Sequence, residues 1–155
     1  MTQELLMKFY REMLRIRLAE EKLIELWLAN ELRSLLHLST GQEAVAVGVC
    51  QALGKEDLIL STHRCHAHYL AKGGSLKKMY AELAGKADGC SRGKGGSMHL
   101  FEPSAGIFLS LPLVGGSIPI AVGTAFSTRL KEIKRVTVAF FGDGERFGVH
   151  IKYSR

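Results

Sequence analysis

The stretch VTVAFFGDG, residues 136–144, decides the fold class. Its first six residues are mostly β-branched or aromatic and apolar on both faces, which predicts a strand over 136–141 in the middle of a parallel sheet. Gly142, Asp143 and Gly144 follow where this strand ends. Ligands of parallel α/β sheets bind just beyond the carboxyl ends of the strands. The stretch therefore predicts an α/β fold with a ligand site at this turn.

Outward from this strand, the sequence predicts helices and one further strand. Residues 3–30 form a predicted long helix, because Leu6, Phe9, Met13 and Ile16 recur at spacings of three and four, and Leu23 and Trp27 extend this stripe. Such a stripe is typical of a core or a subunit interface. The other predicted elements are a helix over 44–53 capped by Ser39 or Thr40 and ended by Gly54, a buried strand over 57–60, a helix capped by Ser75, and a helix over 118–131.

Composition indicates one globular domain. The chain has 155 residues, of which 46% are hydrophobic and 23% charged. The formal charge of +6 is dispersed, and no nucleic-acid-binding module accompanies it, so we expect no nucleic-acid partner. The sequence shows neither a signal peptide nor an apolar run of about 18 residues, which argues against a membrane protein. The chain has three cysteines, Cys50, Cys65 and Cys90, whose spacing is not that of a metal-binding motif. We therefore expect reduced thiols in a cytoplasmic protein.

Glycine is concentrated in the second half of the chain. Most of the 17 glycines lie between Gly85 and Gly148, which indicates close backbone approaches to a ligand, or tight turns. The segment from Gly89 to His99 adds Arg92 and Lys94 and is, on its own, a flexible basic loop.

Asp143 is a candidate metal ligand. A carboxylate repels phosphate but can hold a divalent cation that bridges to it, and Mg²⁺ favours this arrangement. One alternative is an ordinary β-turn, in which Asp-Gly is common. Another is a dinucleotide fingerprint built on Gly142, Gly144 and Gly148, although its spacing is one residue too long.

The run from His63 to His68 contains a second candidate site. The planar guanidinium of Arg64 can bind a diphosphate through two parallel hydrogen bonds. His63, His66 and His68 could instead hold zinc, but no carboxylate or second cysteine completes a ligand set nearby. Ordinary surface histidines are the remaining interpretation.

His37 precedes the predicted helix over 44–53. It is either a structural histidine or a group that titrates near neutrality and donates a proton to a reacting carbonyl.

Taken together, five stretches resemble the E1 α subunits of thiamin-diphosphate-dependent 2-oxo acid dehydrogenases. They are HLSTGQEAVAVG (37–48), STHRCHAHYLAKGG (61–74), GCSRGKGGSMHL (89–100), VGGSIPIAVGTA (114–125) and VTVAFFGDG (136–144). The second and fourth look closest to the acetoin-dehydrogenase-like branch and its bacterial pyruvate relatives. The two substrates are not separated by these stretches.

The resemblance implies a thiamin-diphosphate-binding fold, here incomplete, in which a long N-terminal helix precedes part of a parallel sheet with flanking helices. It divides the chain into a helical arm (1–35), a cofactor-binding region (36–144) and a divergent tail (145–155).

The resemblance also implies roles for matching residues. Arg64 and His63 would contact the diphosphate with their side chains, and Gly144 and Glu145 would contact it with their backbone. Val114 would contact the aminopyrimidine ring, and Asp143 would bind the Mg²⁺ ion. His37 would act at the reacting carbonyl or in transfer to the lipoyl group.

The resemblance further implies partners. An E1 β subunit would supply the glutamate that activates the cofactor, and a lipoyl-bearing E2 would accept the acyl or hydroxyalkyl group. The expected assembly is a heterotetramer in which the α subunits also contact each other.

The chain departs from the family in two places. Pro112 stands where the family has glycine or another small residue, and proline has a fixed φ and no N–H. After Gly144, residues 146–155 no longer read like the family's next helix, and the asparagine pair that would supply another Mg²⁺ ligand is missing. We therefore expect a truncated or frame-shifted enzyme subunit, or a fragment boundary. The alternative function is an inactive interaction module that pairs with full-length subunits.

Overall fold

A three-stranded parallel sheet lies between the helices of the chain. The computed structural model describes residues 2–32 and 34–146. The strands are β1 (Leu58–Ser61), β2 (Ile107–Ser110) and β3 (Thr137–Ala139), in the order β2-β1-β3. Both pairings of β1 are parallel. This arrangement confirms the expected α/β class with a small parallel sheet.

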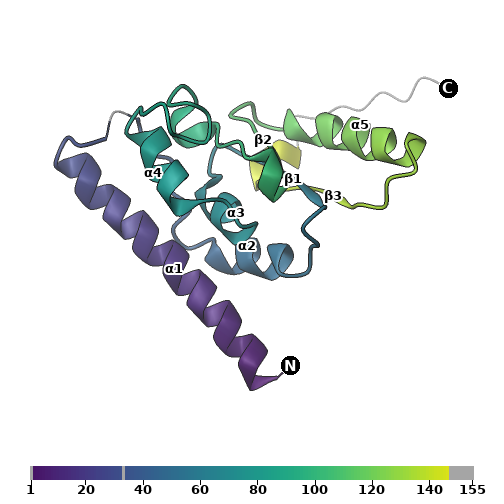
Figure 1. Cartoon of the computed structure of the whole chain (residues 1–155), viewed down its shortest axis with the longest axis horizontal. Coiled ribbons are helices and arrows are strands. Elements are labelled where there is room, and N and C mark those ends of the chain that lie inside the picture. Colours follow the sequence, from purple (N-terminus) through teal and green to yellow (C-terminus); the bar gives the residue numbers. More distant parts are fainter. Residues whose placement is uncertain (1, 33, 147–155) are drawn as a thin grey trace.

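The described residues form five α-helices. They are α1 (Gln3–Leu28), α2 (Glu43–Cys50), α3 (His66–Ala71), α4 (Leu76–Leu83) and α5 (Ser117–Leu130). Figure 1 shows α5 on one side of the sheet and α2 and α3 on the other. α1 runs beneath and packs against both α2 and α3. The single-turn 3-10 helices Gly96–Met98, Pro103–Ala105 and Asp143–Arg146 complete the described elements.

Most predicted helices are confirmed, with one wrong cap. The long N-terminal helix, the helix over 118–131 and the cap at Ser75 all occur, and the Ser75 side chain accepts the N–H of Lys78. Ser39 and Thr40 do not cap α2, which begins after Gln42 and ends at Cys50 rather than at Gly54. The buried hydroxyl of Ser39 instead donates to Glu20 of α1, so a tertiary hydrogen bond replaces the local one.

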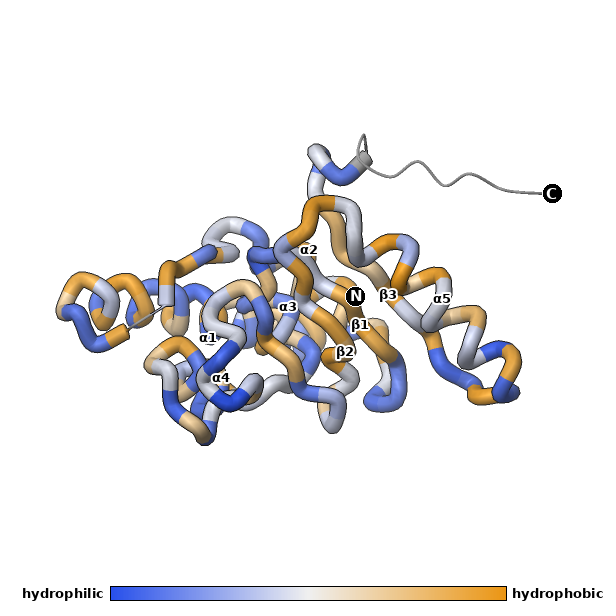
Figure 2. The backbone as a smooth tube through the Cα atoms, turned by 90° about the horizontal axis from the view of Figure 1, so that it is seen from above, coloured by the Kyte–Doolittle hydropathy of each residue, from blue (hydrophilic) through white to orange (hydrophobic). Residues whose placement is uncertain are grey.

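The strand predicted over 136–141 occurs as β3, which lies at an edge of the described sheet rather than in its middle. Within the described residues, β3 pairs only with β1. β1 occupies the middle because β2, which was not among the predicted elements, pairs with its other side. Val136 is 55% exposed and Phe141 56% exposed, so the apolar ends of this stretch are not covered. Figure 2 shows such hydrophobic stretches along the sheet and in α5.

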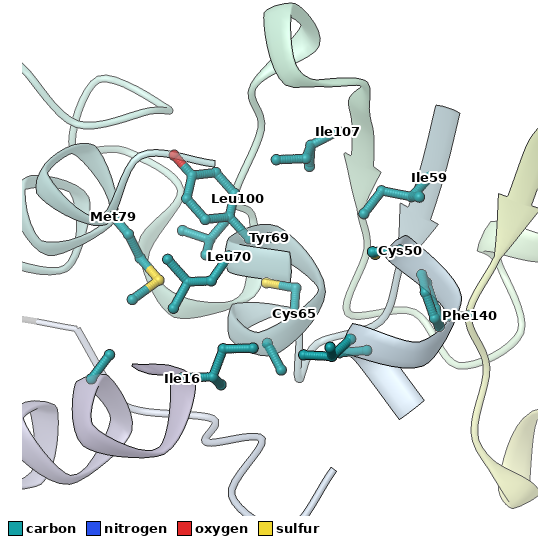
Figure 3. Close-up of a cluster of buried hydrophobic side chains, with 14 of the residues drawn as sticks. Ile16, Cys50, Ile59, Cys65, Tyr69, Leu70, Met79, Leu100, Ile107 and Phe140 are labelled. Carbon is teal, nitrogen blue, oxygen red and sulfur yellow. The ribbon is translucent and has the colours of Figure 1, made fainter. Parts of the chain in front are cut away.

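One hydrophobic core joins α1 to the sheet. Figure 3 shows Ile16 of α1, Tyr69 of α3, Ile59 of β1 and Phe140 beyond β3 in the same cluster of buried side chains. Of the predicted apolar stripe of α1, Ile16 and Leu23 are buried and Phe9 and Met13 half-buried, whereas Leu6 and Trp27 are exposed. The middle of α1 therefore belongs to the core. Among the described helices, none is both long and apolar enough to cross a membrane.

His68 connects α3 to the two strands that carry the candidate site. Its ring stacks on Phe140, with a centroid distance of 3.7 Å and an interplanar angle of 16°. Its Nδ1 lies 2.7 Å from Ser61 Oγ, at the end of β1. Burial lowers the pKa of His68 from 6.5 to about 4, because the charged form loses its hydration. This side chain is therefore neutral in the folded chain at pH 7.

This burial predicts a loss of stability in mild acid. Between pH 6.5 and about 4, the unfolded chain binds a proton on His68 that the folded chain does not. The free energy of unfolding should fall as the pH decreases through this window, by up to about 1.4 kcal/mol per pH unit from this residue. Above the unfolded pKa, the residue should contribute no pH dependence. Urea unfolding followed by circular dichroism, at a series of pH values, measures the slope.

The matched control is His68→Gln, which keeps a polar side chain but does not titrate. Other histidines and carboxylates contribute equally to both proteins, so the difference between the two slopes isolates His68. Equal slopes for the two proteins would contradict a buried neutral His68.

Candidate functional site

The three parallel strands bring three loops to one edge of the sheet. Residues 62–64 follow β1, residues 111–116 follow β2, and residues 140–145 follow β3. Because all three strands run in the same direction, their carboxyl ends lie at the same edge. This is the edge at which α/β sheets bind ligands. The candidate residues His63, Arg64, Val114 and Asp143 all lie in these loops.

A pocket of about 450 Å³ opens between the ends of β1 and β3. It is lined by Gln42, Val45, Thr62, His63, Arg64, His68, Phe140, Phe141, Gly142, Asp143 and Glu145. A larger hollow of about 710 Å³ lies along the first turns of α1, from Thr2 to Glu12, and contains none of the candidate residues. The pocket at the sheet edge is therefore the candidate functional site.

Arg64 reaches this pocket from the loop after β1. Its side chain is exposed, and its Nη1 donates to the carbonyl oxygen of Leu38 at 2.5 Å. Its backbone N–H donates to Thr62 Oγ1 at 3.2 Å. These contacts hold the guanidinium beside the pocket, where it can donate further hydrogen bonds to an anion.

Asp143 and Glu145 line the same pocket from a 3-10 turn after β3, which also contains Gly144. Asp143 and Gly144 are exposed, and Gly144 does not line the pocket. The Glu145 side chain is 5% exposed, and its Oε2 has no hydrogen-bond partner among the described residues. The backbone N–H of Glu145 donates to the carbonyl of Gly142 at 3.2 Å. In this conformation the pocket thus contains a carboxylate at Asp143 and another at Glu145.

His37 lies next to His63 rather than among the pocket-lining residues. The two rings meet edge to face, with centroids 6.0 Å apart and an interplanar angle of 85°. The backbone N–H of His37 donates to Ser97 Oγ at 2.8 Å. Its ring Nδ1 is buried without a hydrogen-bond partner among the described residues. The fold therefore brings His37, which is distant in sequence from the three loops, to the margin of the pocket.

Val114 lies apart from the other candidate residues. It is exposed in the loop after β2, at the same edge of the sheet, but it does not line the pocket. The turn is held by Leu111, whose N–H donates to the carbonyl of Ser61 at 3.1 Å, and by Gly115, whose φ of 78° favours glycine. The backbone role of Val114 toward a cofactor stays a prediction.

The histidine run does not form a zinc site. His66 contacts Glu20 and Ser97, His68 contacts Ser61 and Phe140, and His63 faces His37. No group of three possible metal-ligating side chains occurs within residues 2–32 and 34–146. Cys65, in the same run, is fully buried, and this burial raises the pKa of its thiol to about 11. Within this run, His63, Arg64 and His68 line the pocket, whereas His66 is buried and does not line it.

The alternative dinucleotide fingerprint finds no support in the part that the structure describes. Gly142 is followed by the single-turn 3-10 helix Asp143–Arg146 instead of the first turn of an α-helix that would bind a pyrophosphate. Gly148 lies outside the described residues.

The glycine-rich loop 89–96 surrounds the buried carboxylate of Glu82. The two carboxylate oxygens accept four backbone N–H groups at 2.7 to 3.0 Å, from Ser91, Gly93, Gly95 and Gly96. A Cβ on Gly89 would lie 2.4 Å from Glu82 Oε2. The close backbone approach expected from the glycines therefore serves an internal carboxylate. These four N–H groups are already paired and do not form a phosphate cradle.

Two acidic residues that organise the site were missed in the sequence. Glu20 and Glu82 are both buried, in α1 and α4. Glu20 falls at helical spacing between Ile16 and Leu23, and Glu82 lies beside Leu83 on the apolar face of its helix. A glutamate on the apolar stripe of an amphipathic helix indicates a buried carboxylate. Such a group needs buried hydrogen-bond donors, so it predicts a polar network in the core.

Comparison with known proteins identifies relatives of this chain. The family model described as "Dehydrogenase E1 component" matches residues 11–146. The α subunit of the acetoin:2,6-dichlorophenolindophenol oxidoreductase of Bacillus subtilis is 46% identical over 144 residues, which cover 93% of this chain and 43% of that protein. The mitochondrial pyruvate dehydrogenase E1 component subunit alpha of Solanum tuberosum is 42% identical over 139 residues, which cover 90% of this chain and 36% of that protein.

The chain thus spans less than half the length of these relatives. The family match nevertheless covers most of the chain and includes α2 to α5, all three strands and the loops that form the pocket. The chain therefore belongs to the dehydrogenase E1 component family.

Proposed function

We propose that these residues serve in the α subunit of a thiamin-diphosphate-dependent dehydrogenase that acts on a 2-oxo acid such as pyruvate, or on acetoin. The observation that carries the proposal is the convergence of Arg64 and Asp143 on one pocket at the carboxyl edge of a parallel sheet, in a member of the dehydrogenase E1 component family. Relatives named for acetoin and for pyruvate both match this chain, so the proposal covers both substrates.

The residues around the pocket fit a diphosphate that is bridged by Mg²⁺. Arg64 offers a planar cation with several N–H donors. Asp143, in the lining of the same pocket, offers a carboxylate of the kind that binds Mg²⁺ together with phosphate oxygens. Glu145 Oε2, which has no hydrogen-bond partner among the described residues, also favours a cation in this pocket, because an isolated buried carboxylate oxygen is costly.

Within this proposal each residue has a defined task. His63 and Arg64 donate hydrogen bonds to the diphosphate, Asp143 binds the metal ion, and the backbone of Val114, Gly144 and Glu145 contacts the cofactor. Thiamin diphosphate, when bound, supplies the carbon nucleophile and the electron sink of the reaction. His37, at the margin of the pocket, holds or donates a proton at the oxygen of the reacting carbonyl.

The proposal includes partners and a location. An E1 β subunit would supply the activating glutamate, a lipoyl-bearing E2 would accept the product group, and two α subunits would associate within a heterotetramer. The exposed apolar residues Tyr10 and Leu18 of α1, and Val122 and Phe126 of α5, support such contacts. A cytoplasmic location is supported by the free cysteines and by the Bacillus subtilis relative.

A second candidate function is an inactive interaction module. It is favoured by the same exposed apolar residues and by the position of β3 at an edge of the sheet in the described part of the chain. The two functions predict different effects of substitutions in the pocket. Such substitutions lower turnover if the chain is part of an active enzyme subunit, and they leave it unchanged if the chain is an inactive interaction module.

Arg64→Ala should weaken cofactor binding in a complete α/β assembly. Loss of a hydrogen bond to a charged group typically costs about 1.5–3 kcal/mol, so the dissociation constant of thiamin diphosphate should rise accordingly. Arg64→Lys should rescue binding only in part, because lysine lacks the planar fork. Titration calorimetry measures both effects, with Arg129→Ala on the exposed end of α5 as the control. Unchanged affinity in the Arg64→Ala protein would remove this residue from the site.

His37→Ala should retain cofactor binding and lose turnover. General acid–base assistance is typically worth about 10²–10⁴-fold, which sets the expected decrease in kcat. The matched control is His99→Ala, because His99 is exposed and its ring contacts only the carbonyl of Gly95 among the described hydrogen bonds. Wild-type turnover in the His37→Ala protein would return this histidine to a structural role.

A polypeptide of residues 1–155 should show no dehydrogenase activity when it is combined with an E1 β subunit, thiamin diphosphate and Mg²⁺. Asp143 is exposed and belongs to no group of three ligating side chains in the described part of the chain. Mg²⁺ requires near-octahedral ligation, and a misplacement of about 1 Å can cost about 10²-fold in rate. A 2-oxo acid or acetoin assay with an artificial electron acceptor should compare this chain with one extended through the asparagine pair of the family. Comparable turnover by the two would overturn this expectation.

A further inference from the structure

A buried chain of hydrogen bonds runs from α1 to the backbone of His37. Glu20 Oε2 lies 3.2 Å from His66 Nδ1, and His66 Nε2 lies 2.9 Å from Ser97 Oγ. Ser97 Oγ in turn accepts the backbone N–H of His37 at 2.8 Å. Glu20 and His66 are 0% exposed and Ser97 is 2% exposed. Water therefore cannot replace any of these hydrogen bonds, so each group depends on its neighbour in the chain for a hydrogen-bond partner.

The donors and acceptors in this chain fix its direction. The oxygens of the Glu20 carboxylate accept hydrogen bonds, so His66 donates its Nδ1–H to Oε2, and Oε1 accepts the hydroxyl of Ser39 at 2.7 Å. His66 Nε2 accepts the hydroxyl hydrogen of Ser97, because no other acceptor contacts this hydroxyl among the described residues. Ser97 keeps a lone pair for the N–H of His37. In this arrangement every member of the chain is satisfied.

The order Glu–His–Ser is that of a nucleophilic triad, but its surroundings exclude this role. Ser97 is buried and does not line the pocket, so its hydroxyl cannot meet a substrate. One of its lone pairs is occupied by the N–H of His37. The geometry points instead to a structural device that acts on His37.

Ser97 is itself held on both sides. Its backbone N–H donates to Ser34 Oγ at 2.9 Å. The preceding residues Gly95 and Gly96 donate their N–H groups to the buried Glu82 carboxylate at 2.7 and 3.0 Å. Gly96 has a φ of 62°, and a Cβ there would lie 2.8 Å from Ser34 Oγ. The hydroxyl of Ser97 is therefore presented to His37 from a fixed backbone.

We propose that Ser97 is a positioning residue for His37, with His66 and Glu20 fixing the direction of its hydroxyl. This inference rests on the proposed catalytic role of His37. The His37 ring makes no hydrogen bond of its own through Nδ1 among the described residues. Its place beside His63 consequently depends on packing and on how its backbone is anchored. Ser97 provides that anchor.

The first measurement needs no cofactor. In the 155-residue chain, ¹⁵N NMR should find the amide of His37 protected from hydrogen exchange and the His66 ring with its proton on Nδ1. Ser97→Ala should accelerate exchange of the His37 amide about tenfold, the order expected for the loss of one buried hydrogen bond. Ser97→Thr, which keeps the hydroxyl, should restore protection.

Ser110→Ala is the matched control. Ser110 is also a buried serine, and its hydroxyl donates to the carbonyl of Leu100 at 2.8 Å, outside the chain that leads to His37. This variant should leave exchange of the His37 amide unchanged. Equal acceleration by Ser97→Ala and Ser110→Ala would show a general loss of stability and would overturn the proposal.

The second measurement uses the complete α/β assembly. Ser97→Ala should lower kcat about tenfold and leave the substrate KM and the cofactor dissociation constant unchanged, as expected for a misplaced catalytic group. Unchanged kcat, in an assembly where His37→Ala is inactive, would overturn the positioning role alone. Full turnover in His37→Ala would instead overturn the proposed function of His37, and the positioning role with it.

The proposal can be tested on the wild-type chain if the Ser97→Ala protein does not fold. The wild-type chain must still show the Nδ1–H form of His66 and a protected His37 amide. A proton on Nε2 of His66, or free exchange at the His37 amide, would overturn the proposal without any variant.

Discussion

Glu20 is a fully buried carboxylate in the middle of α1, and the docking of that helix depends on how the carboxylate is paired. A buried charge is strongly destabilising unless hydrogen-bond donors surround it. Here the donors come from Ser39 and His66, which belong to two other parts of the chain. The Ser39 hydroxyl also accepts the N–H of Ala67, so the same residue fixes the start of α3. One carboxylate thereby sets the positions of α1, the loop before α2, and α3.

Glu82 repeats this principle in α4. Its carboxylate gathers four N–H groups of the glycine-rich loop 89–96 and holds that loop in a shape that side chains would obstruct. Ser97 follows directly and connects the two carboxylates through His66. This region is therefore held by hydrogen bonds to two buried carboxyl groups, and Ser97 links the backbone of the candidate catalytic His37 to it.

The candidate pocket depends on a different constraint, the common direction of the strands. Parallel pairing brings the loops after β1 and β3 together, so Arg64 and Asp143 face one pocket although they are far apart in sequence. His68 fills the space beneath, stacked on Phe140 and bonded to Ser61. The buried networks position His37 beside this pocket, while the sheet positions the residues that would bind an anion and a metal ion.

Local patterns of the sequence predict the α/β class, the long first helix, the cap at Ser75, and the position of Arg64 and Asp143 in loops directly after strands. These patterns are apolar spacing, cap chemistry, and polar residues directly after apolar strands. The folded chain shows in addition that β1 and not β3 is central in the described sheet, that Ser39 pairs with Glu20 instead of capping α2, and that the glycine loop surrounds Glu82. These outcomes depend on partners distant in the chain, because a buried charge or an open strand edge is satisfied by whichever groups the fold brings near, and no local pattern encodes that proximity.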